Sequence, residues 1–277
     1  MLLGQRLRRM AERLSRGIVL RRRLPRDFHR LPLYVTPEAG LRYWAGLSGV
    51  DRDLLHMARE LVRPGAVVWD VGANVGLFAF SAAARAGSSG FVLAVEPDIW
   101  LAQLMDRSSR EIARKNLPAA AVRVLCASVS NGMRVSELEI AERARASNHL
   151  YGISGSTQTG GYRHLQPTVS VVLDLLLDFF PAPTVLKIDV ESHEAEVLRG
   201  ASRLLKEARP MIWCEVDPKN ADVVSKLFHE WNYQLFGAAS EPHPPIPRAW
   251  WSTLAVPGEK VDQADSLDRA HSNQPLR

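Results

Sequence analysis

The chain has 277 residues, of which 46% are hydrophobic, and a formal net charge of +5. This length suits one large domain with small additions, because single hydrophobic cores stop growing near about 250 to 300 residues. A membrane-spanning helix is excluded, since no stretch approaches the roughly 18 uncharged apolar residues that it needs. Cys126 and Cys214 both lie in apolar, strand-like runs, which is typical of buried free thiols and argues against a disulfide framework or a zinc site. We therefore expect a soluble globular protein of the reducing cytoplasm.

The positive charge is concentrated at the N-terminus. Residues 1–30 contain ten Arg and two acidic residues, so this segment has a net charge of +8 and the remainder a net charge of −3. An acidic body argues against a nucleic-acid surface on the fold. Apolar residues recur at helical spacing within this arm, at Leu3, Leu7, Met10 and Leu14. The pattern fits a helix that contacts a membrane surface or a partner, and equally a first helix packed on the body with an Arg-rich outer face.

Extended pieces are expected over 31–44 and a helix over 50–61, and from residue 66 onward strand-like and helix-like segments alternate. Strands are predicted at 66–72, 91–96, 121–129, 184–190, 210–216, 233–236 and 252–256. Helices are predicted at 77–87, 100–116, 173–180, 193–208 and 222–231. Because neighbouring parallel strands need a crossover connection, this alternation predicts an α/β fold with a doubly wound, mostly parallel seven-stranded sheet.

The alternation is interrupted over 130–170, a polar segment rich in Gly, Ser and Thr without a clear helical period. Connections of this length are usually lids or binding loops, so we predict a variable loop here that receives a substrate. Residues 258–277 are charged and polar, and are predicted to be a disordered tail. The expected organisation is a basic arm with a helical extension over 1–62, the α/β domain over 63–257, and the tail. The sequence carries no indication of the oligomeric state.

A glycine-rich loop follows the first strand of the domain, where residues 70–76 read DVGANVG. Glycine at a strand–helix junction permits a tight turn and lets the backbone approach a bound nucleoside or anion closely. The dinucleotide pattern G-x-G-x-x-G is not met, because Asn74 takes the place of its second glycine, and the Gly-Lys-Ser/Thr ending of a phosphate-binding P-loop is missing. The loop therefore predicts a cofactor site at Gly72, Ala73, Asn74 and Gly76 that is not built for a diphosphate.

Two carboxylates end the first two predicted strands. Asp70 precedes the glycine-rich loop, where it would repel a diphosphate but can hold an ammonium group. Glu96 ends the second strand, where doubly wound nucleoside-binding folds place an acid on the ribose hydroxyls. The cofactor that offers a charged amine, a sulfonium and a ribose without phosphate is S-adenosylmethionine. The alternative is that Asp70 and Glu96 only cap the helices that follow.

A second group of chemically active residues follows the strand at 184–190. Alternation along the chain sends Asp189 and Glu191 to one side, with His193 at the start of the next helix. Methyl transfer to an alcohol is helped by a base, and histidine suits this role near neutral pH when a carboxylate orients it. We predict His193 as the general base, with Asp189 or Glu191 as the orienting group. Two alternatives stay open. Either Glu191 and Glu194 only stabilise the helix N-terminus, or Asp189, Glu191, His193 and Glu215 hold a divalent cation; we expect no metal.

These segments resemble the FkbM-type S-adenosylmethionine-dependent methyltransferases, over about residues 66–217. The stretches that carry the resemblance are VVWDVGANVGLFAFSAAARAG, FVLAVEPD, VLDLLLD, VLKIDVESHEAEVLRGASRLL and PMIWCEV. The resemblance implies a class I methyltransferase fold and O-methylation of a hydroxyl on a sugar, a glycan or a secondary metabolite. It also implies a cofactor loop at Asp70, Gly72, Asn74 and Gly76, a ribose contact at Glu96, and a catalytic edge at Asp189, Glu191 and His193.

Two positions depart from the family pattern. Ser192 replaces a glycine, and Ser130 stands where an aspartate commonly lies beside the adenine, so Ser128 or Ser130 is expected to support the adenine instead. These departures leave room for an inactive methyltransferase-fold binding protein, and N-methylation is a further alternative. A nicotinamide-dependent oxidoreductase is disfavoured by the missing middle glycine. The acceptor is expected to be a small molecule or a glycan bound under 130–170 and the N-terminal region, with contacts from His149, Tyr151 and His164.

Overall fold

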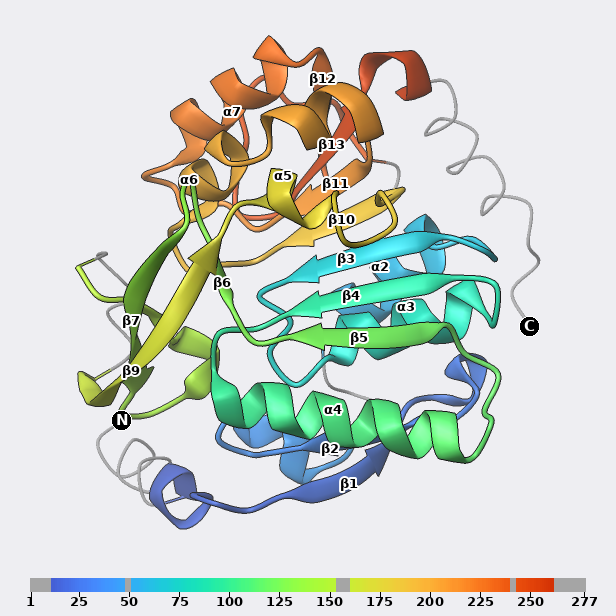
Figure 1. Ribbon diagram of the computed structural model, residues 1–277, viewed down its shortest axis with the longest axis vertical. Coiled ribbons are helices and arrows are strands. Elements are labelled where there is room, and N and C mark those ends of the chain that lie inside the picture. The colour runs from blue at the N-terminus through green and yellow to red at the C-terminus, as the bar shows by residue number, and fades with distance from the viewer. Residues whose placement is uncertain (1–10, 48–50, 153–159, 240–242, 262–277) are drawn as a thin grey trace.

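The computed structural model describes residues 11–47, 51–152, 160–239 and 243–261. Its centre is a seven-stranded sheet (Figure 1) made of β3 (Val67–Val71), β4 (Phe91–Val95), β5 (Ala121–Leu125), β10 (Val185–Ile188), β11 (Met211–Cys214), β12 (Tyr233–Gly237) and β13 (Thr253–Pro257). The helices are α2 (Arg52–Leu61), α3 (Leu77–Ala86), α4 (Ile99–Arg114), α5 (Leu173–Leu176), α6 (Glu194–Arg199) and α7 (Ala221–Glu230).

The order of the strands in this sheet is β12-β13-β11-β10-β3-β4-β5. Strands β11, β10, β3, β4 and β5 pair in parallel with one another. Strand β13 runs antiparallel to both of its neighbours, β11 and β12. The α/β class and the seven strands predicted from the sequence are confirmed. The sheet is mixed, because β13 runs antiparallel to the other strands.

Helices cover both faces of the sheet, because the strands are apolar on both sides. Side chains of α2, α3 and α4 form one core cluster with strand residues such as Val68 and Val92. Side chains of α5, α6 and α7 form a second cluster with Trp69, Val71 and Leu186. Successive residues of β3 thus face opposite helical layers, as the two-residue period of a strand requires. By this alternation Asp70 faces the layer of α2 and α3.

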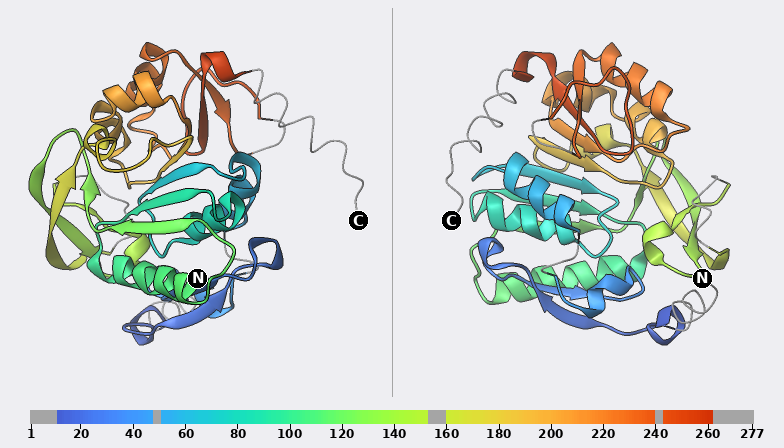
Figure 2. Two further views of the ribbon diagram at one scale, coloured as in Figure 1. Left: turned by 45° about the vertical axis from the view of Figure 1, so that its right-hand side comes forward. Right: turned by 180° about the vertical axis from the view of Figure 1, so that it is seen from behind.

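The N-terminal extension packs against the body. Strands β1 (Leu20–Arg23) and β2 (Pro32–Val35) form an antiparallel pair that lies along α4 (Figures 1 and 2), with short 3₁₀ turns at Arg26–Phe28 and Leu41–Trp44. The Tyr34 N–H donates to Ser108 Oγ at 2.9 Å, and the Tyr34 hydroxyl donates to Glu111 at 2.8 Å. Most of the predicted arm helix falls on residues 1–10, outside the described residues, and Leu14 at its end is 70% exposed.

Strands within 128–150 and 162–171 form a second sheet, so the prediction of a loop over 130–170 is wrong where these strands lie. The strands are β6 (Ser128–Val129), β7 (Arg134–Ala141), β8 (His149–Leu150) and β9 (Tyr162–Val171), in the order β6-β9-β7-β8. In β7 the buried Leu138 and Ile140 alternate with Glu137 and Glu139, which is the sequence signal for this strand. Strand β7 pairs antiparallel with β9 along its length. Figure 1 shows this sheet beside the carboxyl ends of β3, β4 and β5.

Three smaller predictions also change. The strand expected over 121–129 divides, because β5 ends at Leu125 and the chain enters the second sheet at Ser128; Cys126 between them is exposed, whereas Cys214 is buried as expected. The helix expected over 193–208 divides into α6 and a π-helix at Leu204–Ala208. The predicted tail begins with a 3₁₀ turn at Gly258–Lys260, and its remainder from 262 lies outside the described residues. Within the described ranges, no helix is long and apolar enough to cross a membrane.

Candidate cofactor and active site

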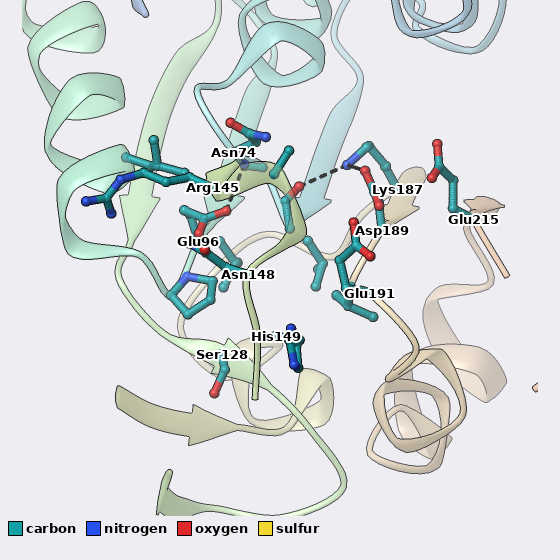
Figure 3. Close-up of a pocket in the computed structure, with 18 of the residues that line it drawn as sticks. Asn74, Glu96, Ser128, Arg145, Asn148, His149, Lys187, Asp189, Glu191 and Glu215 are labelled. Carbon is teal, nitrogen blue, oxygen red and sulfur yellow. Dashed lines mark hydrogen bonds and ion pairs between the residues drawn. The ribbon is translucent and has the colours of Figure 1, made fainter. Parts of the chain in front are cut away.

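A cavity of about 240 Å³ lies at the carboxyl ends of the central parallel strands, which is where open α/β sheets bind their ligands. Eight of the eleven residues predicted for the site line it, namely Gly72, Ala73, Asn74, Glu96, Ser128, Asp189, Glu191 and His193. Figure 3 shows Asn74, Glu96 and Ser128 on one side of the cavity, and Asp189, Glu191 and Glu215 on the other. The other three, Asp70, Gly76 and Ser130, are not among the lining residues.

Gly72 is the tightest point of the cofactor loop. Its φ is +76°, and a Cβ atom there would lie 1.8 Å from the backbone oxygen of Asp189. Both the backbone conformation and the available space therefore require glycine. The N–H groups of Gly72 and Ala73 donate to the Val95 carbonyl at 2.9 and 3.1 Å. The loop thus brings the ends of β3, β4 and β10 together at the cavity, and Gly76 is the N-cap residue of α3.

Glu96 is held rigidly in the cavity wall. Its Oε2 accepts from the Asn74 N–H at 2.8 Å and its Oε1 from the Asp98 N–H at 2.9 Å. The side chain is only 6% exposed, and this burial raises the pKa of Glu96 to about 8, although the two backbone hydrogen bonds oppose the shift. Beside it, Asn74 Oδ1 is buried without a hydrogen-bond partner among the described residues, and a buried polar atom of this kind suits a ligand.

Asp70 does not face the cavity, contrary to the prediction that it holds an ammonium group there. Its side chain is fully buried, and its Oδ1 lies 3.2 Å from Nζ of Lys187. Strand alternation is the reason, because Asp70 and its register partner Lys187 on β10 project to the same face. Burial raises the pKa of Asp70, and Lys187 opposes this shift. Asp70 therefore serves as the counter-ion of a buried lysine under the cavity floor.

Lys187 lines the cavity but was not among the site residues predicted from the sequence. Its Nζ donates to the Gly72 carbonyl at 3.1 Å and lies 3.2 Å from Asp189 Oδ2 (Figure 3). Burial alone would lower the pKa of Lys187, but Asp189, Asp70 and Glu215 together raise it, so the side chain stays charged. The available signal was a lysine inside an apolar strand, because lysine is almost never fully buried unless it is paired.

The Lys187 side of the cavity is rich in carboxylates. Glu191 and Glu215 line it together with Asp189. Burial, followed by repulsion from Asp189, raises the pKa of Glu191 to about 7 and the pKa of Glu215 to about 8. When Glu191 and Glu215 are ionised, the three carboxylates outnumber the Lys187 charge, and this end of the cavity then favours a cationic ligand. In the described part of the chain, no group of three or more His, Cys, Asp or Glu side chains is arranged to hold a metal ion.

His193 lines the cavity, but its partner differs from the predicted one. Among the described residues, no hydrogen bond joins it to Asp189 or Glu191; its Nε2 lies 2.9 Å from Oγ of Ser130 instead. Ser130 is fully buried behind the ring, which corrects its predicted place beside an adenine. Ser128 does line the cavity, and its hydroxyl lies 2.7 Å from that of Ser170. Burial lowers the pKa of His193; Glu196 opposes this shift and Arg134 adds to it.

The backbone before His193 is strained. Glu191 and Ser192 have positive φ values of 44° and 71°, a region that side chains other than glycine rarely adopt. Ser192 compensates in part, because its hydroxyl donates to Asp217 Oδ2 at 2.5 Å and Asn220 Nδ2 donates to its carbonyl at 2.9 Å. The serine that departs from the family pattern thus occupies a position that favours glycine.

The segment after β7 covers the side of the cavity that contains Glu96. Arg145 and Asn148 both line the cavity and donate to Asp98 Oδ2, at 2.5 and 2.8 Å. His149 also lines it, with Nε2 3.2 Å from Glu139. The other two predicted acceptor contacts, His164 and Tyr151, do not line the cavity. His164 is exposed, and Tyr151 is 60% exposed.

The N-terminal extension, which was expected to cover the acceptor together with 130–170, supplies part of the cavity wall. The residues it contributes are Arg42, Tyr43, Asp51 and Leu54. Arg42 is half-exposed and lies 2.9 Å from Asp51. Segments from three distant parts of the sequence therefore enclose one site.

The chain is similar in sequence to known methyltransferases. A family model described as the methyltransferase FkbM domain matches residues 70–237, more than half of the chain. The hexuronic acid methyltransferase AglP of Haloferax volcanii is 28% identical over 186 residues, which cover 65% of this chain and 68% of that protein.

Two solved structures are also similar. Methyltransferase FkbM from Methylobacillus flagellatus is 16% identical with a TM-score of 0.42, and the match covers 73% of this chain but only 50% of that chain. An S-adenosylmethionine-dependent O-methyltransferase from Thermotoga maritima is 16% identical with a TM-score of 0.38, and the match covers 74% of this chain and 63% of that one. On the match to the family model, the chain belongs to the FkbM family of methyltransferases.

Proposed function

We propose that the protein transfers a methyl group from S-adenosylmethionine to a hydroxyl oxygen of a sugar, a glycan or a related secondary metabolite. The observation that carries this proposal is that the Gly72 loop, Glu96 and His193 line the same cavity. When bound, S-adenosylmethionine supplies a methyl group bonded to a positively charged sulfur. The protein then has to align the acceptor oxygen with that methyl group, and alignment of this kind can account for much of the rate.

The residues of the cavity fit this cofactor. Glu96 is positioned to accept hydrogen bonds from the ribose hydroxyls, and the unpartnered Oδ1 of Asn74 lies beside it. Ser128 is available for the adenine. The amine and the sulfonium carry positive charge, which suits Asp189 and Glu191 at the opposite end of the cavity. These two residues take the role that was predicted for Asp70. A phosphate-bearing cofactor would be repelled by the same carboxylates.

His193 is the proposed general base. A base must be neutral when the acceptor arrives, and the lowered pKa of His193 leaves it neutral at pH 7. Its ring borders the cavity, so it can take the hydroxyl proton as the new bond between oxygen and the methyl carbon forms. Among hydroxyl-bearing acceptors, hexuronic acids are the first to test, because the relative AglP is a hexuronic acid methyltransferase.

Calorimetric titration with S-adenosylmethionine tests the first half of the proposal, and failure to bind would favour a binding protein that has lost the cofactor. Transfer of labelled methyl groups to glucuronic acid, galacturonic acid, their neutral parent sugars and glucosamine tests the second half. We expect an O-methylated product, and a methylated amine from glucosamine alone would contradict O-methylation. A His193→Ala change should lower kcat by about 10²- to 10⁴-fold without weakening cofactor binding. His164→Ala, at an exposed position that does not line the cavity, is the control.

A further inference from the structure

The side of His193 that faces away from the cavity makes a specific polar contact. Its Nε2 lies 2.9 Å from the hydroxyl of Ser130, which is completely buried and does not line the cavity. The imidazole ring therefore bridges the cavity and the second sheet. Its other nitrogen, Nδ1, has no hydrogen-bond partner among the residues that the structure describes. The two ring nitrogens thus have different surroundings, and only one of them is free to act on a ligand.

The same hydroxyl is fixed from the other side by Arg134. One guanidinium nitrogen donates to Ser130 Oγ at 2.5 Å and another donates to Asn131 Oδ1 at 3.1 Å. The Ser130 hydroxyl can itself donate to Asn131 Oδ1, which lies 3.5 Å away. Because a guanidinium only donates, Arg134 necessarily occupies one acceptor position of the serine oxygen.

The number of available protons then determines the arrangement. A hydroxyl has one proton to give and can accept two hydrogen bonds. If Ser130 accepts from both Arg134 and the N–H of His193 Nε2, its own proton remains for Asn131 and all three contacts are satisfied. If Ser130 instead donates to Nε2, the contact to Asn131 has no proton. The first arrangement therefore gives a proton to every contact of the buried Ser130 hydroxyl, and buried polar groups usually have their hydrogen bonds satisfied.

We propose that Ser130, held by Arg134, keeps the proton of neutral His193 on Nε2, so that Nδ1 is the nitrogen that accepts the proton of the acceptor hydroxyl. Ser130 and Arg134 are then positioning residues for the base. This inference rests on the proposed function only for the identity of the proton donor, because the tautomer is a property of the free protein.

The charges around the ring agree with this role. Arg134 disfavours a second positive charge next to it, whereas Glu196, which accepts from Asn131 Nδ2 at 2.5 Å, favours one. Together with burial, Arg134 keeps the ring neutral near pH 7. Glu196 limits this effect, so that the ring still accepts a proton during the reaction.

Nuclear magnetic resonance of the full chain labelled with ¹⁵N-histidine, without cofactor or acceptor, tests the proposal. The His193 signals are identified by their absence from a His193→Gln protein. Neutral His193 should show a protonated Nε2 and an unprotonated Nδ1. In Ser130→Ala a mixture of both tautomers should appear, and Ser130→Thr, which keeps the hydroxyl, should restore the single form. Arg134→Gln should raise the pH at which His193 becomes charged by roughly 0.5 to 1 unit, since a neighbouring positive charge is removed.

Ser136→Ala is the matched control, because it removes a part-buried serine hydroxyl from the same sheet, where it lies 2.8 Å from Ser170 Oγ. It should leave the His193 signals unchanged. A proton on Nδ1 in the unaltered protein would overturn the proposal, and so would an unchanged tautomer and midpoint in both Ser130→Ala and Arg134→Gln. Arg134 is exposed, so its variant remains informative if Ser130→Ala does not fold. Since this measurement needs no turnover, its failure is distinguishable from a failure of cofactor binding or methyl transfer.

Discussion

Lys187 and Asp70 form an ion pair beneath the cavity, with 3.2 Å between Nζ and Oδ1, and both side chains are buried. The two residues lie directly opposite each other on the adjacent strands β10 and β3. Lys187 also donates to the Gly72 carbonyl. The pair therefore ties the cofactor loop to the strand that leads to Asp189 and His193, so that the two halves of the site keep their relative positions.

Replacing Lys187 by methionine should lower the free energy of unfolding by about 3 to 5 kcal/mol, because it leaves the Asp70 carboxylate buried without a counter-ion. In the double variant Lys187→Met with Asp70→Asn, the loss in free energy of unfolding should be about 1 to 3 kcal/mol smaller than the sum of the losses of the two single variants. Urea unfolding of all four proteins measures this coupling. Lys226→Met, at an exposed lysine 3.8 Å from Glu230, is the matched control and should cost less than about 1 kcal/mol. Additive losses would show that the pair does not interact.

The affinity for S-adenosylmethionine should rise between pH 6 and pH 9. Burial holds the pKa of Glu96 and of Glu215 at about 8 and the pKa of Glu191 at about 7. Only the ionised carboxylates attract the positive cofactor. Each group that loses its proton on binding therefore increases the affinity by at most about tenfold per pH unit. Calorimetry in buffers of different ionisation enthalpy should detect proton release at pH 7.

Glu96→Gln provides the matched variant for this pH dependence. It should weaken binding by roughly 10- to 100-fold at pH 9, where Glu96 is ionised, because a hydrogen bond to a charged group contributes about 1.5 to 3 kcal/mol. The difference between the two proteins should shrink toward pH 6, where Glu96 is protonated. An affinity that falls as the pH rises would contradict the placement of these carboxylates at the cofactor.

Without cofactor, the same carboxyl groups should make the protein less stable as the pH rises. Their pKa values in the folded protein, about 8 for Glu96 and Glu215 and about 7 for Glu191, lie above the value near 4.5 expected in the unfolded chain. A group raised in this way contributes its full stability below the unfolded pKa and loses that contribution as the pH rises through the folded pKa.

The melting temperature of the cofactor-free protein should therefore fall from pH 6 to pH 9. Each group that is still protonated contributes a slope of roughly 1 kcal/mol per pH unit. Glu96→Gln should flatten this decline, since it removes one of the titrating groups. Differential scanning calorimetry measures both melting temperatures. If those of the unaltered protein and of Glu96→Gln decline in parallel, Glu96 titrates normally.

Ser192 allows a test of the strained turn before His193. Ser192→Ala keeps the Cβ atom at a φ of 71° and loses the hydrogen bond to Asp217, so it should cost about 1 to 3 kcal/mol. Ser192→Gly loses the same hydrogen bond but relieves the strain, so it should be the more stable variant of the two by about 1 kcal/mol. Chemical denaturation gives the order of the two variants, and the reverse order would mean that this turn is not strained.

Much of the cofactor side of the site could be predicted from the sequence. Gly72, Asn74 and Glu96 are identified by their position at strand ends, and strand ends are visible in the local pattern of apolar residues. Asp189, Glu191 and His193 were likewise placed at one cavity. The interpretation of Asp70 failed because its partner, Lys187, is on a strand that is distant in the sequence. The second sheet was missed because its two long strands, β7 and β9, are separated by a polar, glycine-rich segment.

The sequence by itself determined the α/β class, the seven strands and the glycine-rich turn, because each depends on hydrophobic periodicity or on backbone freedom within a few residues. Only the tertiary structure decided which groups meet. It placed Ser130 on His193, 63 positions away, and it buried Asp70 under Lys187. It also determined which residues of the N-terminal extension line the cavity, namely Arg42, Tyr43, Asp51 and Leu54. Contacts of this kind depend on strand register and on the packing of distant segments, which local patterns do not encode.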